Sequence, residues 1–115
     1  MKINPVLLII ALAIAALAAF GFYSANNGEA FRWLITAGAG LSLFVTLGGL
    51  LAFSADGGGG AVNIKVTSVL FFIALLVEHI IFSLAGVALA PYVIITGILL
   101  LLFVLISYAI TRALK

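Results

Sequence analysis

Apolar residues form four long runs along the sequence, separated by short polar or glycine-rich stretches. The runs cover about residues 5–23, 33–54, 66–85 and 92–112. A helix rises about 1.5 Å per residue, so about 20 apolar residues cross the ~30 Å hydrocarbon core of a bilayer. Transmembrane β-strands are only about 10 residues long and alternate apolar with polar positions, unlike these unbroken runs. The pattern predicts four transmembrane helices.

The separators indicate how the helices are connected. Residues 24–29 form a polar turn cluster, Asp56 precedes four glycines (57–60), and Ala90-Pro91 marks a short, uncharged turn. The short last turn predicts that the third and fourth helices form an antiparallel hairpin. The predicted fold class is therefore an all-α integral membrane protein, an antiparallel four-helix bundle with residues 1–115 in a single transmembrane domain. Lys2 before the first run is also typical of a secretory signal, but the length of the run favours a retained helix.

Composition supports a lipid environment. Of 115 residues, 67% are hydrophobic and only 7% are charged, whereas a soluble domain of this size needs a polar shell. The expected partner is therefore the lipid bilayer. The five basic residues are scattered along the chain, so no nucleic-acid partner is expected.

Basic residues also predict the orientation, because short cytoplasmic loops are enriched in Lys and Arg. Four of them (Lys2, Lys65, Arg112 and Lys115) fall on one side of a four-helix protein, and only Arg32 falls on the other. We expect both termini in the cytoplasm (N-in/C-in) and a plasma (inner) membrane of a prokaryote. Aromatic residues collect at membrane interfaces, so Tyr23, Trp33 and Tyr92 are expected at the outer one.

Small residues recur every four positions on two of the predicted helices. They are Ala11, Ala15 and Ala19 in the first run, and Gly38, Ser42 and Thr46 in the second. Helices in lipid associate through such stripes because small side chains allow close approach. We expect the first two helices to pack along them.

Glu78 and His79 are the ionisable residues inside an apolar run. Glu78 lies about 18 Å along the third helix from Val66, just beyond the middle of the bilayer. A charge at that depth costs at least about 2.5–3.5 kcal/mol. Neighbouring helical positions differ by about 100°, so the two side chains point in different directions.

Three interpretations of Glu78 remain open. It is a proton- or cation-binding site with His79 as a relay, or it is protonated and hydrogen-bonded to Ser42, Thr46 or Thr96, locking the bundle. In the third interpretation it pairs with a basic residue of another protein.

Nothing in the sequence predicts an enzyme, a metal site or a cofactor. The chain has no cysteine and one histidine, and it lacks a catalytic triad and a glycine-rich cofactor fingerprint. A haem in a helical bundle usually takes a second axial ligand, which this chain does not offer.

In length and number of spans the chain resembles the small multidrug resistance transporters, a family with an essential membrane-embedded glutamate. In that family the glutamate lies in the first helix. Here the first run has no ionisable residue between Lys2 and Glu29, and Glu78 lies in the third run. The resemblance covers the layout only.

The leading hypothesis is a small polytopic membrane protein that acts as a homo-oligomeric transporter or channel, with Glu78 coupling protons or cations. The alternative is an interaction protein that binds another membrane protein, either as an accessory subunit or as an immunity factor against a membrane toxin.

Overall fold

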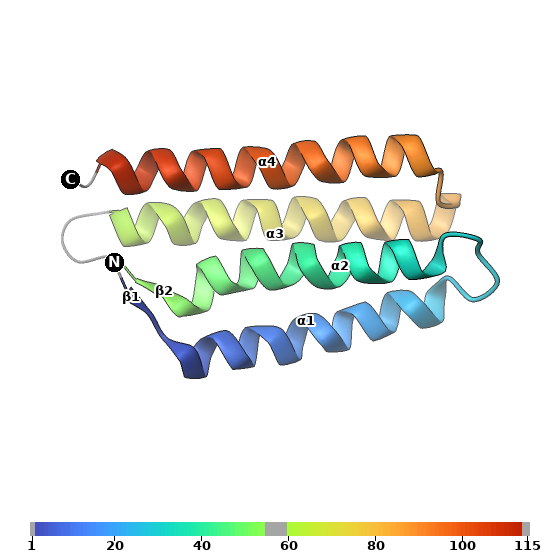
Figure 1. Cartoon of the computed structure of the whole chain (residues 1–115), viewed down its shortest axis with the longest axis horizontal. Coiled ribbons are helices and arrows are strands. Elements are labelled where there is room, and N and C mark those ends of the chain that lie inside the picture. The colour runs from blue at the N-terminus through green and yellow to red at the C-terminus, as the bar shows by residue number, and fades with distance from the viewer. Residues whose placement is uncertain (1, 55–59, 114–115) are drawn as a thin grey trace.

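Seven elements make up the part of the chain described by the computed structural model, residues 2–54 and 60–113. In chain order they are β1 (Lys2–Ile3), α1 (Pro5–Ala25), α2 (Arg32–Leu47), the π-helical turn η1 (Gly48–Ala52), β2 (Phe53–Ser54), α3 (Gly60–Ala85) and α4 (Leu89–Ala113) (Figure 1). The four long helices confirm the predicted all-α class. Asp56 and Lys115, used in the sequence predictions, lie outside the described residues, as does most of the glycine run at 57–60.

Local chemistry explains where α1 begins and where α1 and α3 end. Oδ1 of Asn4 accepts hydrogen bonds from the backbone N–H groups of Val6 and Leu7 at 3.0 and 3.3 Å, which caps α1. Past the end of α1, Gly28 has a φ of +90°, and directly after α3 Gly86 has a φ of +98°. Both angles favour glycine because a Cβ is disfavoured there.

The predicted helix boundaries differ from the observed ones at two places. The second run ends its α-helix at Leu47 and continues as η1, so it is not one uninterrupted helix. Pro91 does not mark the last turn. Residues 86–88 form the turn, and Pro91 lies in the first turn of α4, where a helix has no intrahelical partner for the missing N–H.

The four helices run antiparallel, each beside its neighbour in the sequence (Figure 1). Helices α1 and α4 lie at opposite edges of the row, and the Cα atoms extend over 48 × 27 × 15 Å. Strand β1 and the C-terminal end of α4 lie at the end of the row opposite the α1–α2 and α3–α4 connections (Figure 1). The arrangement is thus a flattened row of antiparallel helices.

A short sheet joins the start of the chain to the end of the second run. Strands β1 and β2 pair antiparallel, with Lys2 opposite Ser54 and Ile3 opposite Phe53. This pairing was not predicted, since each strand has only two residues.

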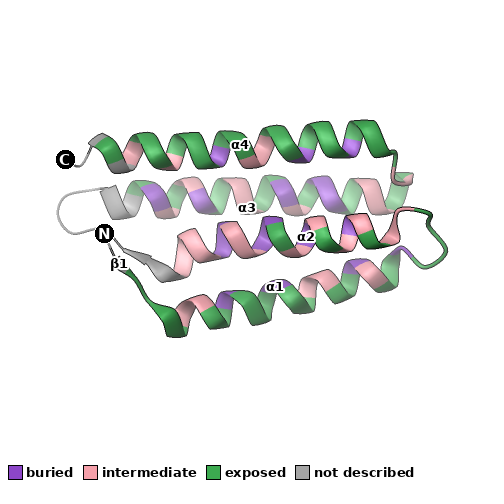
Figure 2. Cartoon of the chain, in the orientation of Figure 1, coloured by how far each residue is buried: buried purple, intermediate pink, exposed green. Residues whose placement is uncertain are grey.

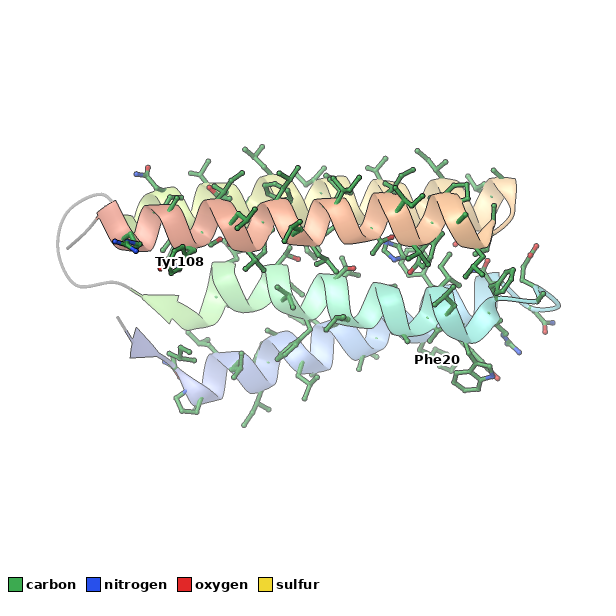
Figure 3. All side chains as sticks on the ribbon, turned by 45° about the horizontal axis from the view of Figure 1, so that its top comes forward. Phe20 and Tyr108 are labelled. Atoms are coloured by element: carbon green, nitrogen blue, oxygen red, sulfur yellow. The ribbon has the colours of Figure 1, made fainter. Side chains whose placement is uncertain are left out.

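Four helical segments are long and apolar enough to cross a membrane. They are Pro5–Ala25, Arg32–Leu51, Asn63–Ala85 and Leu89–Ile110. Exposed positions run along all four helices (Figure 2). Many of them carry large apolar side chains, including Phe20, which is 65% exposed (Figure 3). Such a surface is unfavourable in water and favourable in lipid, so the fold is that of a multi-pass membrane protein.

Candidate intramembrane acid–histidine site

Glu78 joins the third helix to the fourth. It lies seven residues before the end of α3 at Ala85, about 10 Å from that end, and its side chain is buried. Oγ1 of Thr96 on α4 donates a hydrogen bond to Oε2 of Glu78 at 2.5 Å. Of the three hydroxyl residues predicted as partners of Glu78, Thr96 is thus the one that forms a hydrogen bond with its carboxyl group.

His79 is fully buried, and its ring contacts side chains of α1 and α4. Its Nδ1 lies 2.7 Å from the backbone oxygen of Leu75, and its Nε2 lies 2.9 Å from the hydroxyl group of Tyr92 on α4. A carbonyl oxygen can only accept, so Nδ1 carries a proton; in the neutral imidazole, Nε2 accepts from the Tyr92 O–H. The ring of Phe22 on α1 meets the imidazole edge to face, with centroids 5.7 Å apart.

Glu78 and His79 also approach each other. Oε1 of Glu78 lies 3.4 Å from Nδ1 of His79. The Nδ1–H group points to the Leu75 carbonyl, so this approach is electrostatic, and Oε1 has no hydrogen-bond partner within residues 2–54 and 60–113. The site therefore holds one satisfied and one unsatisfied carboxyl oxygen in an environment of low dielectric.

Gly38 on α2 makes room for this arrangement. A Cβ at position 38 would overlap the Tyr92 hydroxyl group, would lie 3.0 Å from Tyr92 Cζ and would lie 3.5 Å from Nε2 of His79. A side chain at this position is therefore incompatible with the observed Tyr92–His79 hydrogen bond.

This placement corrects the expectation that Gly38 faces the first helix. Helix α1 packs on other positions of α2: Ala15 and Phe22 cluster with Ala39 and Leu43, and a Cβ at Gly40 would lie 3.4 Å from Ala19. The alanine stripe of α1 is at the contact, because Ala11 and Ala15 are buried. The face of α2 that packs on α1 is therefore offset by about one residue from the predicted face.

Ser42 and Thr46 are both fully buried, but no hydrogen bond joins either one to Glu78. The Thr46 hydroxyl group donates to the backbone oxygens of Ser42 and Leu43 at 2.9 and 3.2 Å. Such bonding within one helix is a common alternative for hydroxyl groups in lipid. Oγ of Ser42 has no hydrogen-bond partner among the described residues.

Tyr92 is a member of the site that sequence reasoning missed. It was expected beside Tyr23 and Trp33 at the outer interface. Those two rings do contact each other at the α1–α2 end, with centroids 4.8 Å apart and planes tilted by 49°, but Tyr92 is only 2% exposed and points inward. The available signal was its four-residue spacing from Thr96, which places both side chains on one face of α4.

A groove of about 340 Å³ lies between α3 and α4, and Glu78 is part of its lining. Its lining residues are Ala74, Val77, Glu78, Ile81, Phe82 and Ile95. Glu78 is the ionisable member of this lining. Across residues 2–54 and 60–113, no group of three or more His, Cys, Asp or Glu side chains gathers to hold a metal ion.

Comparison of the chain with protein-family models, with curated proteins and with solved structures finds no match.

Proposed function

We propose that this protein is a small membrane transporter or channel that works as a homo-oligomer and uses Glu78 to couple transport to a proton or a cation. The supporting observation is the Glu78 carboxyl group. Oε2 accepts a hydrogen bond from Thr96, while Oε1 is buried without a hydrogen-bond partner in the described part of the chain and lies 3.4 Å from Nδ1 of His79. A carboxyl group with a spare oxygen has the capacity to bind a proton or a cation.

A purely structural link between α3 and α4 does not require an acid. A glutamine at position 78 would accept the same hydrogen bond from Thr96 without the cost of about 2.5–3.5 kcal/mol that an ionised group carries in lipid. The groove between α3 and α4 supports a binding role, because Glu78 is one of its lining residues.

The flattened shape supports the proposal of a homo-oligomer. The four helices lie in a row (Figure 1), and a row alone does not surround a path across the bilayer. A second copy related by two-fold symmetry would supply the opposite wall. We place the protein in the plasma (inner) membrane of a prokaryote, with both termini in the cytoplasm, on the distribution of basic residues.

A second candidate function is supported by the same groove. A Lys or Arg side chain of another membrane protein, entering between α3 and α4, would lie beside Glu78 and form a buried ion pair with its carboxylate. The protein would then be an accessory subunit or an immunity-type protein with no transport activity of its own.

Proton flux into liposomes tests the first candidate. The purified protein is reconstituted into liposomes that contain a pH-sensitive dye, and a potassium diffusion potential set with valinomycin drives protons inward. The unmodified protein should acidify the interior faster than empty liposomes, and Glu78→Gln should return the rate to that background because the amide cannot take up the proton. Parallel runs with Na⁺ or K⁺ as the driven ion test cation coupling.

Glu29→Gln is the matched control. Glu29 is the same residue type but lies exposed in the α1–α2 connection, so its substitution should leave the flux unchanged. A flux that survives Glu78→Gln contradicts the role of Glu78. Absence of proton, Na⁺ and K⁺ flux from the unmodified protein contradicts transport and leaves the interaction protein as the better candidate.

A further inference from the structure

His79 has a partner on each ring nitrogen, and the two partners differ in kind. The Leu75 carbonyl at Nδ1 can only accept a hydrogen bond, whereas the Tyr92 hydroxyl at Nε2 can either donate or accept. A neutral imidazole therefore receives the Tyr92 O–H at Nε2. A doubly protonated imidazolium donates from Nε2 to the same oxygen after the O–H has rotated.

We propose that Tyr92 is a positioning residue that lets His79 gain and lose a proton at Nε2 in place, which makes His79 the second proton-binding group of the Glu78 site. This inference rests on the proposed function, because it assigns a second proton to the site said to couple transport. The proton added at Nε2 comes from the aqueous phase and returns to it. Nδ1 keeps its own proton throughout, held by the Leu75 carbonyl.

The surroundings of His79 favour this assignment. Among the described residues, two titratable groups face it. They are Glu78 on its own helix and Tyr92 on α4. Oε1 of Glu78 lies 3.4 Å from Nδ1. Helix α1 presents the ring of Phe22 and α2 presents Gly38, and neither of these titrates. Oε1 of Glu78, which has no hydrogen-bond partner among the described residues, is the carboxyl oxygen on the side of Nδ1.

The position of the Tyr92 hydroxyl group is tightly constrained. Tyr92 is 2% exposed, its ring meets the rings of His79 and Phe82 edge to face at 5.3 and 5.4 Å, and Gly38 borders its oxygen. These contacts hold the oxygen 2.9 Å from Nε2.

Nitrogen-15 NMR tests the inference directly, because the chain contains a single histidine. Protein labelled with ¹⁵N-histidine in lipid gives imidazole signals from His79 alone, and protonated and bare ring nitrogens resonate in well-separated ranges. Near neutral pH we expect a protonated Nδ1 and a bare Nε2. On acidification Nε2 should move to the protonated range while Nδ1 stays there.

Tyr92→Phe removes only the hydroxyl group. At a pH where the unmodified protein shows both forms of Nε2, this variant should show a smaller protonated fraction, since the imidazolium has lost its acceptor. Tyr108→Phe is the control, because Tyr108 lies on the same helix but is 58% exposed, and it should leave the His79 signals unchanged.

Three results would overturn the inference: a bare Nδ1 with a protonated Nε2 near neutral pH, an Nε2 that stays bare in the folded protein as the pH falls, or identical titrations of the unmodified protein and Tyr92→Phe. The first two need no variant, so the test stands if Tyr92→Phe fails to fold. The signals do not depend on flux. Loss of the proposed transport and loss of this proton site are therefore distinguishable.

Discussion

The hydroxyl group of Tyr92 occupies the space in which a Cβ at Gly38 would lie. A methyl group there would overlap that oxygen and come within 3.0 Å of Tyr92 Cζ. Gly38→Ala should therefore displace Tyr92 and lower the free energy of unfolding by about 1–3 kcal/mol, as overpacking does. Denaturation with SDS from mild detergent micelles measures the change, and the ¹⁵N signals of His79 report the lost contact.

Gly97→Ala is the control for this substitution. Gly97 lines the same groove between α2 and α4 as Gly38, but no atom lies within 4 Å of the position of its Cβ. This variant should be as stable as the unmodified protein or slightly more stable, because alanine is the better helix former. Equal destabilisation by the two substitutions would contradict the close approach at Gly38.

Thr96→Val should show how much the hydrogen bond between α3 and α4 contributes to stability. Valine has the shape of threonine but cannot donate to Oε2 of Glu78, so we expect a loss of about 1–3 kcal/mol in the free energy of unfolding. A double-mutant cycle with Glu78→Met measures the interaction energy between the two side chains. We expect this interaction energy to account for most of the loss caused by Thr96→Val.

Thr46→Val serves as the comparison in the same cycle. Thr46 is also buried, but within the described residues its hydroxyl group bonds to backbone oxygens of its own helix alone. Its coupling to Glu78→Met should lie within about 0.5 kcal/mol of zero. A coupling as large as that of Thr96 would mean that the observed hydrogen bond does not carry the effect.

Gly49→Ala should disturb the packing of η1 on α3. Its Cβ would lie 2.5 Å from Oγ of Ser68 and 3.2 Å from Cζ of Phe103. We expect destabilisation of about 1–3 kcal/mol in the same SDS titration. Adding Ser68→Ala removes the closest atom and should restore part of the stability; a double variant that is no more stable than Gly49→Ala would place the cause elsewhere.

Asn26→Ala should loosen the end of α1 from α3. The Asn26 side chain is fully buried, and its Nδ2 donates to the backbone oxygen of Phe22 at 2.8 Å and to Oγ of Ser83 at 3.0 Å. Loss of both bonds should cost about 1–3 kcal/mol. Asn27→Ala, at the exposed neighbouring position, should change stability little, and hydrogen exchange at the end of α1 should increase only in Asn26→Ala.

The site was predictable in part. Glu78 stood out from the sequence because an ionisable residue in an apolar run is costly, and Thr96 was one of three hydroxyl residues proposed as its partner. The selection of Thr96 over Ser42 and Thr46 was not predictable, because it depends on how far each helix is rotated about its own axis. The inward position of Tyr92 has the same origin.

The sequence by itself determined that the chain forms four long apolar helices, since only a helix satisfies its backbone hydrogen bonds within one apolar segment in lipid. Tertiary structure decided which faces meet: Gly38 against Tyr92, Ala15 against Ala39 and Leu43, and Thr96 against Glu78. The physical reason is that lipid is as apolar as the protein interior. Apolar side chains then cover all sides of each helix, and only close packing and a few polar contacts select the face that is buried.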